Sequence, residues 1–199
     1  TLKISGKATI CMPYHKLLDC LEEDRLAGKK FGSTRRGIAP VYADKYMKKT
    51  LRMGDLLDLE DHAEHLADIV EWKNLTVERG YGHEPIQASD MMAWLREFGL
   101  PWTDYICDTT LYLNKAIADG QNVLFEAQLG ALRDIDFGIF PYTSSSSSIA
   151  AYAPVGAGIP GHQLDSSIGI MKAYSSCVGE GPFTCEFFGD EAHALREAG

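Results

Sequence analysis

The sequence predicts an α/β fold, and three stretches carry that prediction. An apolar run at 123–125 ends on Glu126 and has the length and flanks of a buried strand. Residues 8–12 form a second strand-like run, and a helical pattern over 14–27 follows it directly. Apolar residues at helical spacing then recur between 51 and 119. Because ligands in open α/β sheets lie beyond the carboxyl ends of strands, we expect a site in the loop after residue 125.

Composition narrows the class of protein. The 199 residues are 45% hydrophobic and 24% charged, which is typical of a globular domain with a core. With 19 basic against 28 acidic residues, the net charge of −9 argues against a general surface for nucleic acid or anionic membranes. No apolar run of about 18 residues occurs, so we expect no membrane span. Five scattered cysteines without C-x-x-C predict reduced thiols and a cytoplasmic location.

The first helix is delimited by its flanking residues. Pro13 opens it and Gly28 closes it, which predicts a helix over 14–27. His15 sits at the junction of strand and helix, where a lone histidine is more often a capping or core residue than a catalyst.

A basic segment follows at 29–50, and its glycines and Pro40 predict a loop. It carries seven of the 19 basic residues. Ser33 and Thr34 precede Arg35 and Arg36, so hydroxyls, backbone N–H groups and guanidinium groups are available to bind an anion. A solvated basic face explains the same residues, and the pattern leaves both interpretations open.

Three further helices are predicted at 51–77, 89–98 and 103–119, and a terminal helix at 190–199. His62 and His65 have the spacing of metal ligands, but no other ligand lies near them in sequence. A solvated helix face is therefore the favoured interpretation. Residues 168–173 are read as a second buried strand.

Six consecutive hydroxyl residues, 143–148, follow the acidic pair Asp134 and Asp136. Composition alone favours a flexible serine linker. The position after a strand favours a loop whose hydroxyls and backbone N–H groups bind phosphate.

Three stretches together resemble the adenylosuccinate synthetase family. They are GSTRRGIAPVYADKYMKKTLRMGDL at 32–56, NVLFEAQLGALRDIDFGIFPYTSSSSS at 122–148, and GIMKAYSSCVGEGPFTCEFF at 169–188. Their order and spacing match the family along residues 2 to 190. Such agreement between three motifs in register is far more specific than one glycine motif.

The resemblance implies the fold and the activity. The chain would be a single central segment, 1–199, of a P-loop-like synthetase core that lacks its phosphate loop. It would have a largely parallel sheet, a helical insertion at about 55–120, and a homodimeric assembly. Members of the family join IMP and L-aspartate to form adenylosuccinate in purine biosynthesis, using GTP and Mg²⁺ through a 6-phosphoryl intermediate.

The resemblance also implies a set of IMP-binding positions. Thr34 matches the threonine that holds the IMP phosphate, and Ser144 falls at a hydroxyl position used for IMP. Lys48 stands where the family has an arginine that reaches the partner's IMP. Leu129 occupies the position of an IMP-contacting glutamine, unless the loop shifts by one residue so that Gln128 replaces it.

Several departures predict a divergent member with an altered or weakened nucleotide site. Arg35 replaces a family glycine, Arg133 a leucine and Cys177 an arginine, while Lys48 keeps a charge without the bidentate fork. The chain contains no G-x-x-x-x-G-K loop.

Family motifs that are absent from this sequence indicate which functional groups the chain lacks. No catalytic or metal-binding residue is predicted here, and the principal ligands of Mg²⁺ and GTP are expected elsewhere in the family's sequence. We therefore expect no ligase activity from this chain alone. The alternative is a non-catalytic nucleotide-binding or regulatory paralogue.

Overall fold

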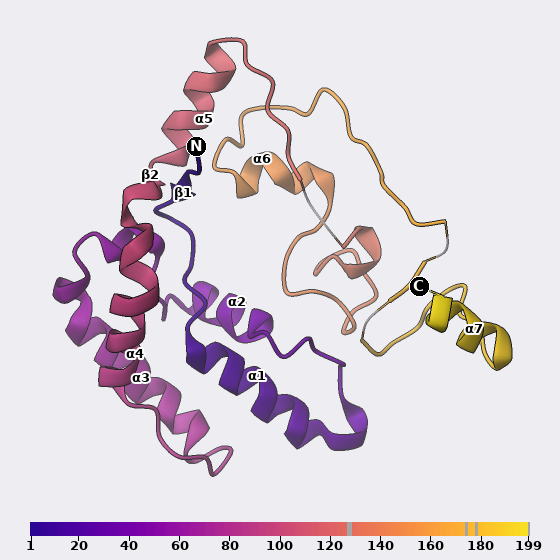
Figure 1. Cartoon of the computed structure of the whole chain (residues 1–199), viewed down its shortest axis with the longest axis horizontal. Coiled ribbons are helices and arrows are strands. Elements are labelled where there is room, and N and C mark those ends of the chain that lie inside the picture. Colours follow the sequence, from indigo (N-terminus) through magenta and orange to yellow (C-terminus); the bar gives the residue numbers. More distant parts are fainter. Residues whose placement is uncertain (127–128, 174, 178, 199) are drawn as a thin grey trace.

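Helices dominate the computed structural model, which describes residues 1–126, 129–173, 175–177 and 179–198 (Figure 1). The α-helices are α1 (Pro13–Leu26), α2 (Ile38–Met47), α3 (Ala63–Val77), α4 (Ala88–Trp94), α5 (Thr109–Ala118), α6 (Ala153–Gly156) and α7 (Asp190–Ala198). Short 3-10 turns span Ala27–Lys29, Met53–Leu56, Leu59–His62, Leu100–Tyr105, Ala131–Arg133 and Ala150–Tyr152, and a π-turn spans Leu95–Gly99.

The sheet of the described residues has two short strands. β1 (Ile4–Ser5) pairs in parallel with β2 (Ile106–Cys107), so that Ile4 lies opposite Ile106 and Ser5 opposite Cys107. Parallel pairing across a hundred residues of helical chain is the connection expected of an α/β fold. The predicted fold class is confirmed.

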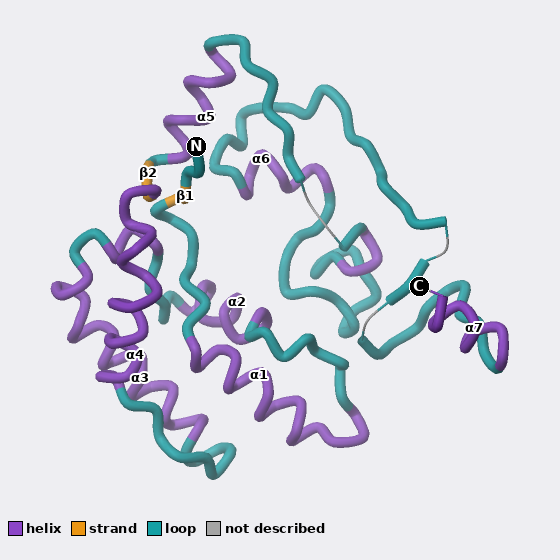
Figure 2. Tube along the Cα trace, in the orientation of Figure 1, coloured by secondary structure: helices purple, strands orange, loops and turns teal. Residues whose placement is uncertain are grey.

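The hydrophobic core lies between α1, α3 and α4. Its most buried apolar side chains include Met12, Tyr14, Leu51, Leu66 and Leu95, each almost inaccessible to solvent. The described residues between 121 and 189 are mostly loops and turns around the short α6, in an arc away from that helical body (Figure 2).

The prediction of strands at 8–12, 123–125 and 168–173 was wrong. Residues 8–12 are extended but make only an isolated antiparallel bridge, between Thr9 and Arg52. Residues 123–125 are loop, and Leu124 is 92% exposed. Residues 168–173 are loop too, with Ile170 95% exposed. A short apolar run becomes a strand only where a neighbouring segment pairs with it over several residues. Segment 51–53 bonds to the backbone of Ala8 and Ile10 alone, and no described segment bonds to the backbone of 123–125 or 168–173.

Helix prediction succeeded at α1 and α7 and failed at α2. The segment 29–50, which was predicted as a loop, contains α2. Pro40 does not prevent this helix, because it is only the third residue of α2. A proline in the first helical turn removes an N–H that has no partner inside the helix. The helix predicted over 103–119 is also interrupted, since β2 separates a 3-10 turn from α5.

Candidate functional site

Two buried carboxylates of α1 hold the loop 31–37, which leads into α2. Glu23 accepts hydrogen bonds from the backbone N–H groups of Phe31, at 3.2 Å, and Gly32, at 3.3 Å. Asp19 accepts one from the Ser33 hydroxyl at 2.6 Å and one from the backbone N–H of Gly37 at 2.8 Å. Because charge-assisted hydrogen bonds are short and directional, α1 fixes the course of this loop.

Gly37 permits the close packing of this loop against α1. It caps the N-terminus of α2 with φ +82°, and a Cβ there would lie 2.7 Å from the carbonyl carbon of His15. A larger residue would clash with backbone, so the glycine of the motif sets the approach of the two helices.

Thr34 lies at the exposed side of the same loop. Neither its hydroxyl nor its backbone N–H makes a hydrogen bond within the described part of the chain. The Arg35 guanidinium points elsewhere, to the Asp24 carboxylate at 2.7 Å, and that hydrogen bond raises the pKa of Arg35 above its ordinary value. The positive charge added at this position is therefore neutralised on α1, and Thr34 keeps two unused donors.

The serine run is folded around one carboxylate and is not a free linker. Asp134, fully buried, accepts hydrogen bonds from the backbone N–H groups of Asp136 at 2.9 Å and Phe137 at 3.1 Å through one oxygen. Its other oxygen accepts from Ser148 at 2.7 Å and Ile149 at 3.4 Å. Burial by itself would raise the pKa of Asp134, but the four N–H donors outweigh it and lower the pKa below its ordinary value.

Ser144 lies within the loop that this carboxylate organises. Its backbone N–H donates to the carbonyl oxygen of Arg133 at 2.8 Å, and its hydroxyl shares a hydrogen bond with that of Ser146 at 3.2 Å. A hydroxyl bonded only to another hydroxyl can turn to a ligand at little cost.

The three motif stretches meet at these loops. The rings of Phe31 and Tyr142 are in edge contact, with centroids 6.3 Å apart. The backbone N–H of Glu180 donates to the carbonyl of Phe31 at 3.0 Å. Gly32 and Gly179 approach so closely that a Cβ on Gly32 would lie 2.6 Å from the other Cα. Loop 31–37 thus meets two loops that lie far along the chain from it. We call the described residues of these three segments the three-loop cluster: 31–37, 130–148, and 175–177 with 179–181.

Arg133 ties this cluster together. Its guanidinium contacts the carbonyl oxygen of Tyr142 and the sulfur of Cys177. Two of the positions predicted to depart from the family pattern, Arg133 and Cys177, are therefore in contact with each other.

The predicted IMP-binding residues do not all lie in one place. Thr34 and Ser144 belong to loops that contact each other in the three-loop cluster. Lys48 caps the opposite end of α2, about 15 Å along a helix of ten residues. It is exposed, with φ +61°, and its ammonium has no partner among the described residues. Leu129 is half exposed with φ +81°, and Gln128 lies outside the described residues.

Sequence reasoning missed the residues that support the cluster. Asp19 and Glu23 are spaced i, i+4 on α1, and together with His15 they form a polar stripe on a helix otherwise anchored by leucines. That spacing was the available signal. Nothing local distinguishes Asp134 from Asp136, since only the fold selects which carboxylate becomes buried.

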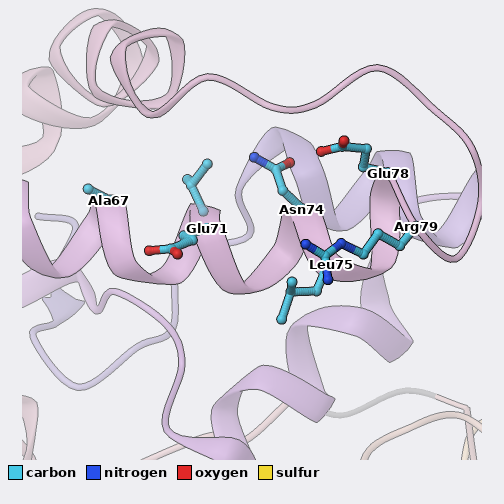
Figure 3. A pocket seen from close by; sticks show the side chains of 7 residues that line it. Ala67, Glu71, Asn74, Leu75, Glu78 and Arg79 are labelled. Carbon is cyan, nitrogen blue, oxygen red and sulfur yellow. The ribbon is translucent and has the colours of Figure 1, made fainter.

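Two hollows in the described residues lie away from the cluster. One of about 390 Å³ runs along α3, and Glu71, Asn74, Leu75, Glu78 and Arg79 are among the residues that line it (Figure 3). Another, of about 300 Å³, lies at the carboxyl ends of β1 and β2. Neither contains a predicted site residue.

The described residues offer neither a metal centre nor a membrane span. No three His, Cys, Asp or Glu side chains lie close enough together there to hold a metal ion. No helix there is both long and apolar enough to cross a bilayer.

Comparison with known proteins agrees with the motif geometry. The family model for adenylosuccinate synthetase matches residues 1–199. The adenylosuccinate synthetase of Symbiobacterium thermophilum is 43% identical over 199 residues, and that of a Geobacillus species is 39% identical over 198. Each alignment covers 100% of this chain but only 46% of the relative, so the chain spans about half the length of the curated relatives it matches.

The fold is similar to a solved structure of the same name. The structure of the fully ligated adenylosuccinate synthetase from Plasmodium falciparum superposes with a TM-score of 0.88 at 29% identity. The match covers 98% of this chain and 46% of that one. The whole of the chain is therefore accounted for by one family, and it belongs to the adenylosuccinate synthetase family.

Proposed function

We propose that this chain supplies part of the IMP site and a dimer contact of an adenylosuccinate synthetase. The complete protein would be a cytoplasmic homodimer that ligates IMP and L-aspartate with GTP and Mg²⁺ in purine biosynthesis. The contact between the Thr34 loop and the Ser144 loop carries the proposal, because it brings together two motifs that the resemblance assigns to IMP. A regulatory paralogue has no support among the comparisons.

The chemistry of the cluster suits the phosphate of a nucleotide. Thr34 offers a hydroxyl and a backbone N–H, and Ser144 offers a second hydroxyl. The backbone of both loops is fixed beforehand, by Asp19 and Glu23 on one side and by Asp134 on the other. Donors that are already in position bind an oxyanion without the free-energy cost of ordering a loop.

Lys48 would serve a different nucleotide. Its place at the far end of α2 keeps it away from the Thr34 loop of the same chain. Because it is exposed and carries a charge, it fits contact with the IMP of a partner subunit, as the resemblance implies for this position.

Mg²⁺ and GTP would contribute phosphoryl transfer in the complete protein, by activating the IMP oxygen that aspartate displaces. The described residues offer no cluster of metal ligands and no phosphate loop, so no step of the proposal runs through groups of this chain bound to Mg²⁺ or GTP. The chain binds and orients IMP.

Thr34→Ala is expected to weaken IMP binding by about 1 kcal/mol or more, the size of a hydrogen bond to a charged group. Calorimetric titration of the two proteins with IMP measures the difference. Thr76→Ala is the matched control, because Thr76 is an exposed threonine on α3, outside the cluster. Equal affinity in the wild-type protein and Thr34→Ala would contradict an anion site at 31–37.

The 199-residue chain alone is expected to form no adenylosuccinate from IMP, L-aspartate, GTP and Mg²⁺. No residue of it matches the family's base or phosphate-loop lysine. Product formation followed by chromatography tests this, and turnover by the purified chain would refute it.

A further inference from the structure

A buried polar network joins α1, α2 and α3 outside the three-loop cluster. The Asp44 carboxylate accepts a hydrogen bond from His15 Nε2 at 2.8 Å through one oxygen, and from the Lys73 ammonium through the other. His15, Asp44 and Lys73 are 0%, 1% and 7% exposed. We refer to these three residues as the buried network.

The protonation of the network follows from its partners. His15 Nδ1 accepts a hydrogen bond from the backbone N–H of Met12 at 2.9 Å, so this nitrogen carries no hydrogen. The hydrogen must then be on Nε2, which donates to Asp44. The histidine is neutral, and the network holds one carboxylate and one ammonium.

The network restrains α2 at both ends. Asp44 lies in the last turn of α2, and its backbone carbonyl accepts from the N–H of Lys49 at 3.0 Å, closing the left-handed turn that presents Lys48. At the other end, the backbone of His15 abuts the Gly37 cap. A rotation or slide of α2 would break the bonds to His15 and Lys73 and leave charges buried without partners, at considerable cost.

Stability alone does not explain a buried ion pair. Apolar residues of similar volume are often as stable or more stable in such a place, because they require no desolvation of charge. The directional bonds instead select one position of the helix.

We propose that the buried network is a positioning device for nucleotide binding, through which Lys73 on α3 sets the placement of α2 and thereby of Lys48 and the Thr34 loop. The inference rests on the proposed function for its ligand, IMP. It makes Lys73 and His15 positioning residues that touch no nucleotide, and gives the helix α3 a part in the site.

The test removes both charges, so that no ionised group is left buried without a partner. The double variant Asp44→Asn/Lys73→Met keeps an amide oxygen to accept from His15 and replaces the ammonium with an apolar chain. We expect its thermal midpoint to stay near that of the wild-type protein. Amide exchange at Lys48 and Lys49 should accelerate by about tenfold or more, and IMP binding should weaken by a similar factor.

Two controls separate positioning from general stability. Leu66→Ala opens a cavity in the core at a residue of α3 that is not a member of the network, and it should lower the thermal midpoint without selective loss of protection at Lys48 and Lys49. Lys115→Met makes the same chemical change at an exposed pair with Asp119 and should alter neither readout. Lys73→Gln, which keeps a donor for Asp44, is the milder variant should the double variant not fold.

The outcomes distinguish this inference from the proposed function. Wild-type exchange at Lys48 and Lys49 in the folded double variant would overturn the positioning role, whether or not IMP binds. Failure of the wild-type protein to bind IMP would overturn the proposed function, while the exchange data would still decide the role of the network.

Discussion

Asp134→Ala is expected to unfold the serine loop and to weaken IMP binding by about tenfold or more, the loss of more than one hydrogen bond to phosphate. The carboxylate accepts four backbone N–H groups from both sides of the loop, and alanine leaves all four without an acceptor. Amide exchange at Ser148 and Ile149 together with IMP titration measures the effect.

Asp136→Ala is the matched control for Asp134. It removes an exposed carboxylate two residues away that takes no part in holding the loop, although its backbone N–H is one of the four donors. We expect it to resemble the wild-type protein. Retained protection at Ser148 in Asp134→Ala would contradict the role of this carboxylate.

The lowered pKa of Asp134 gives the same prediction a pH dependence. The four donors favour the ionised carboxylate, so its contribution to stability is complete above the ordinary aspartate pKa of about 3.9 and is lost as the pH falls through the lower folded value. Protection of the serine loop should therefore decline below about pH 4. Asp134→Asn, which cannot ionise, should abolish this acid dependence of the loop.

Asp44→Ala is expected to lower the free energy of unfolding by about 3–5 kcal/mol, because it leaves the Lys73 ammonium buried without its carboxylate. The His15 Nε2–H loses its acceptor as well. Urea unfolding measures the change.

An exposed ion pair supplies the comparison for Asp44. Asp119→Ala removes the partner of Lys115 on the surface and should change the free energy of unfolding by less than about 1 kcal/mol. A loss at Asp44 no greater than the loss at Asp119 would mean that the buried network contributes little.

Local signals in the sequence predicted some elements well. Pro13 and Gly28 bracket α1, and the charged, amphipathic tail forms α7. Each depends on residues within a turn or two of the helix end, where helix capping is decided. Pro40 led to the prediction of a loop in place of α2, because the local sequence does not distinguish a proline in the first turn of a helix from a proline in a loop.

The features that were not predicted correctly from the sequence depend on contacts between distant segments. The apolar run at 123–125 predicts a strand, yet a strand needs a neighbour, and none of the described segments pairs with it. Composition favoured a serine linker, whereas the course of 143–148 depends on Asp134, and hence on where the chain becomes buried. Burial of one carboxylate among many is a property of the packed molecule.

The residues of the candidate site also fall into two groups: those that the sequence identified and those that only the structure revealed. Resemblance of the motifs selected Thr34, Lys48 and Ser144, and the structure places two of these in contacting loops. The assignment of IMP to them remains a prediction. The supporting carboxylates Asp19 and Glu23 emerged only from their hydrogen bonds to loop 31–37.

Direct titration of the purified chain with IMP, repeated with GTP, tests the central claim. The proposed function predicts that IMP binds and that GTP does not, because the chain has the hydroxyl groups proposed to bind the IMP phosphate but has no phosphate loop. Absence of any heat with IMP, or binding of GTP in preference to IMP, would contradict it.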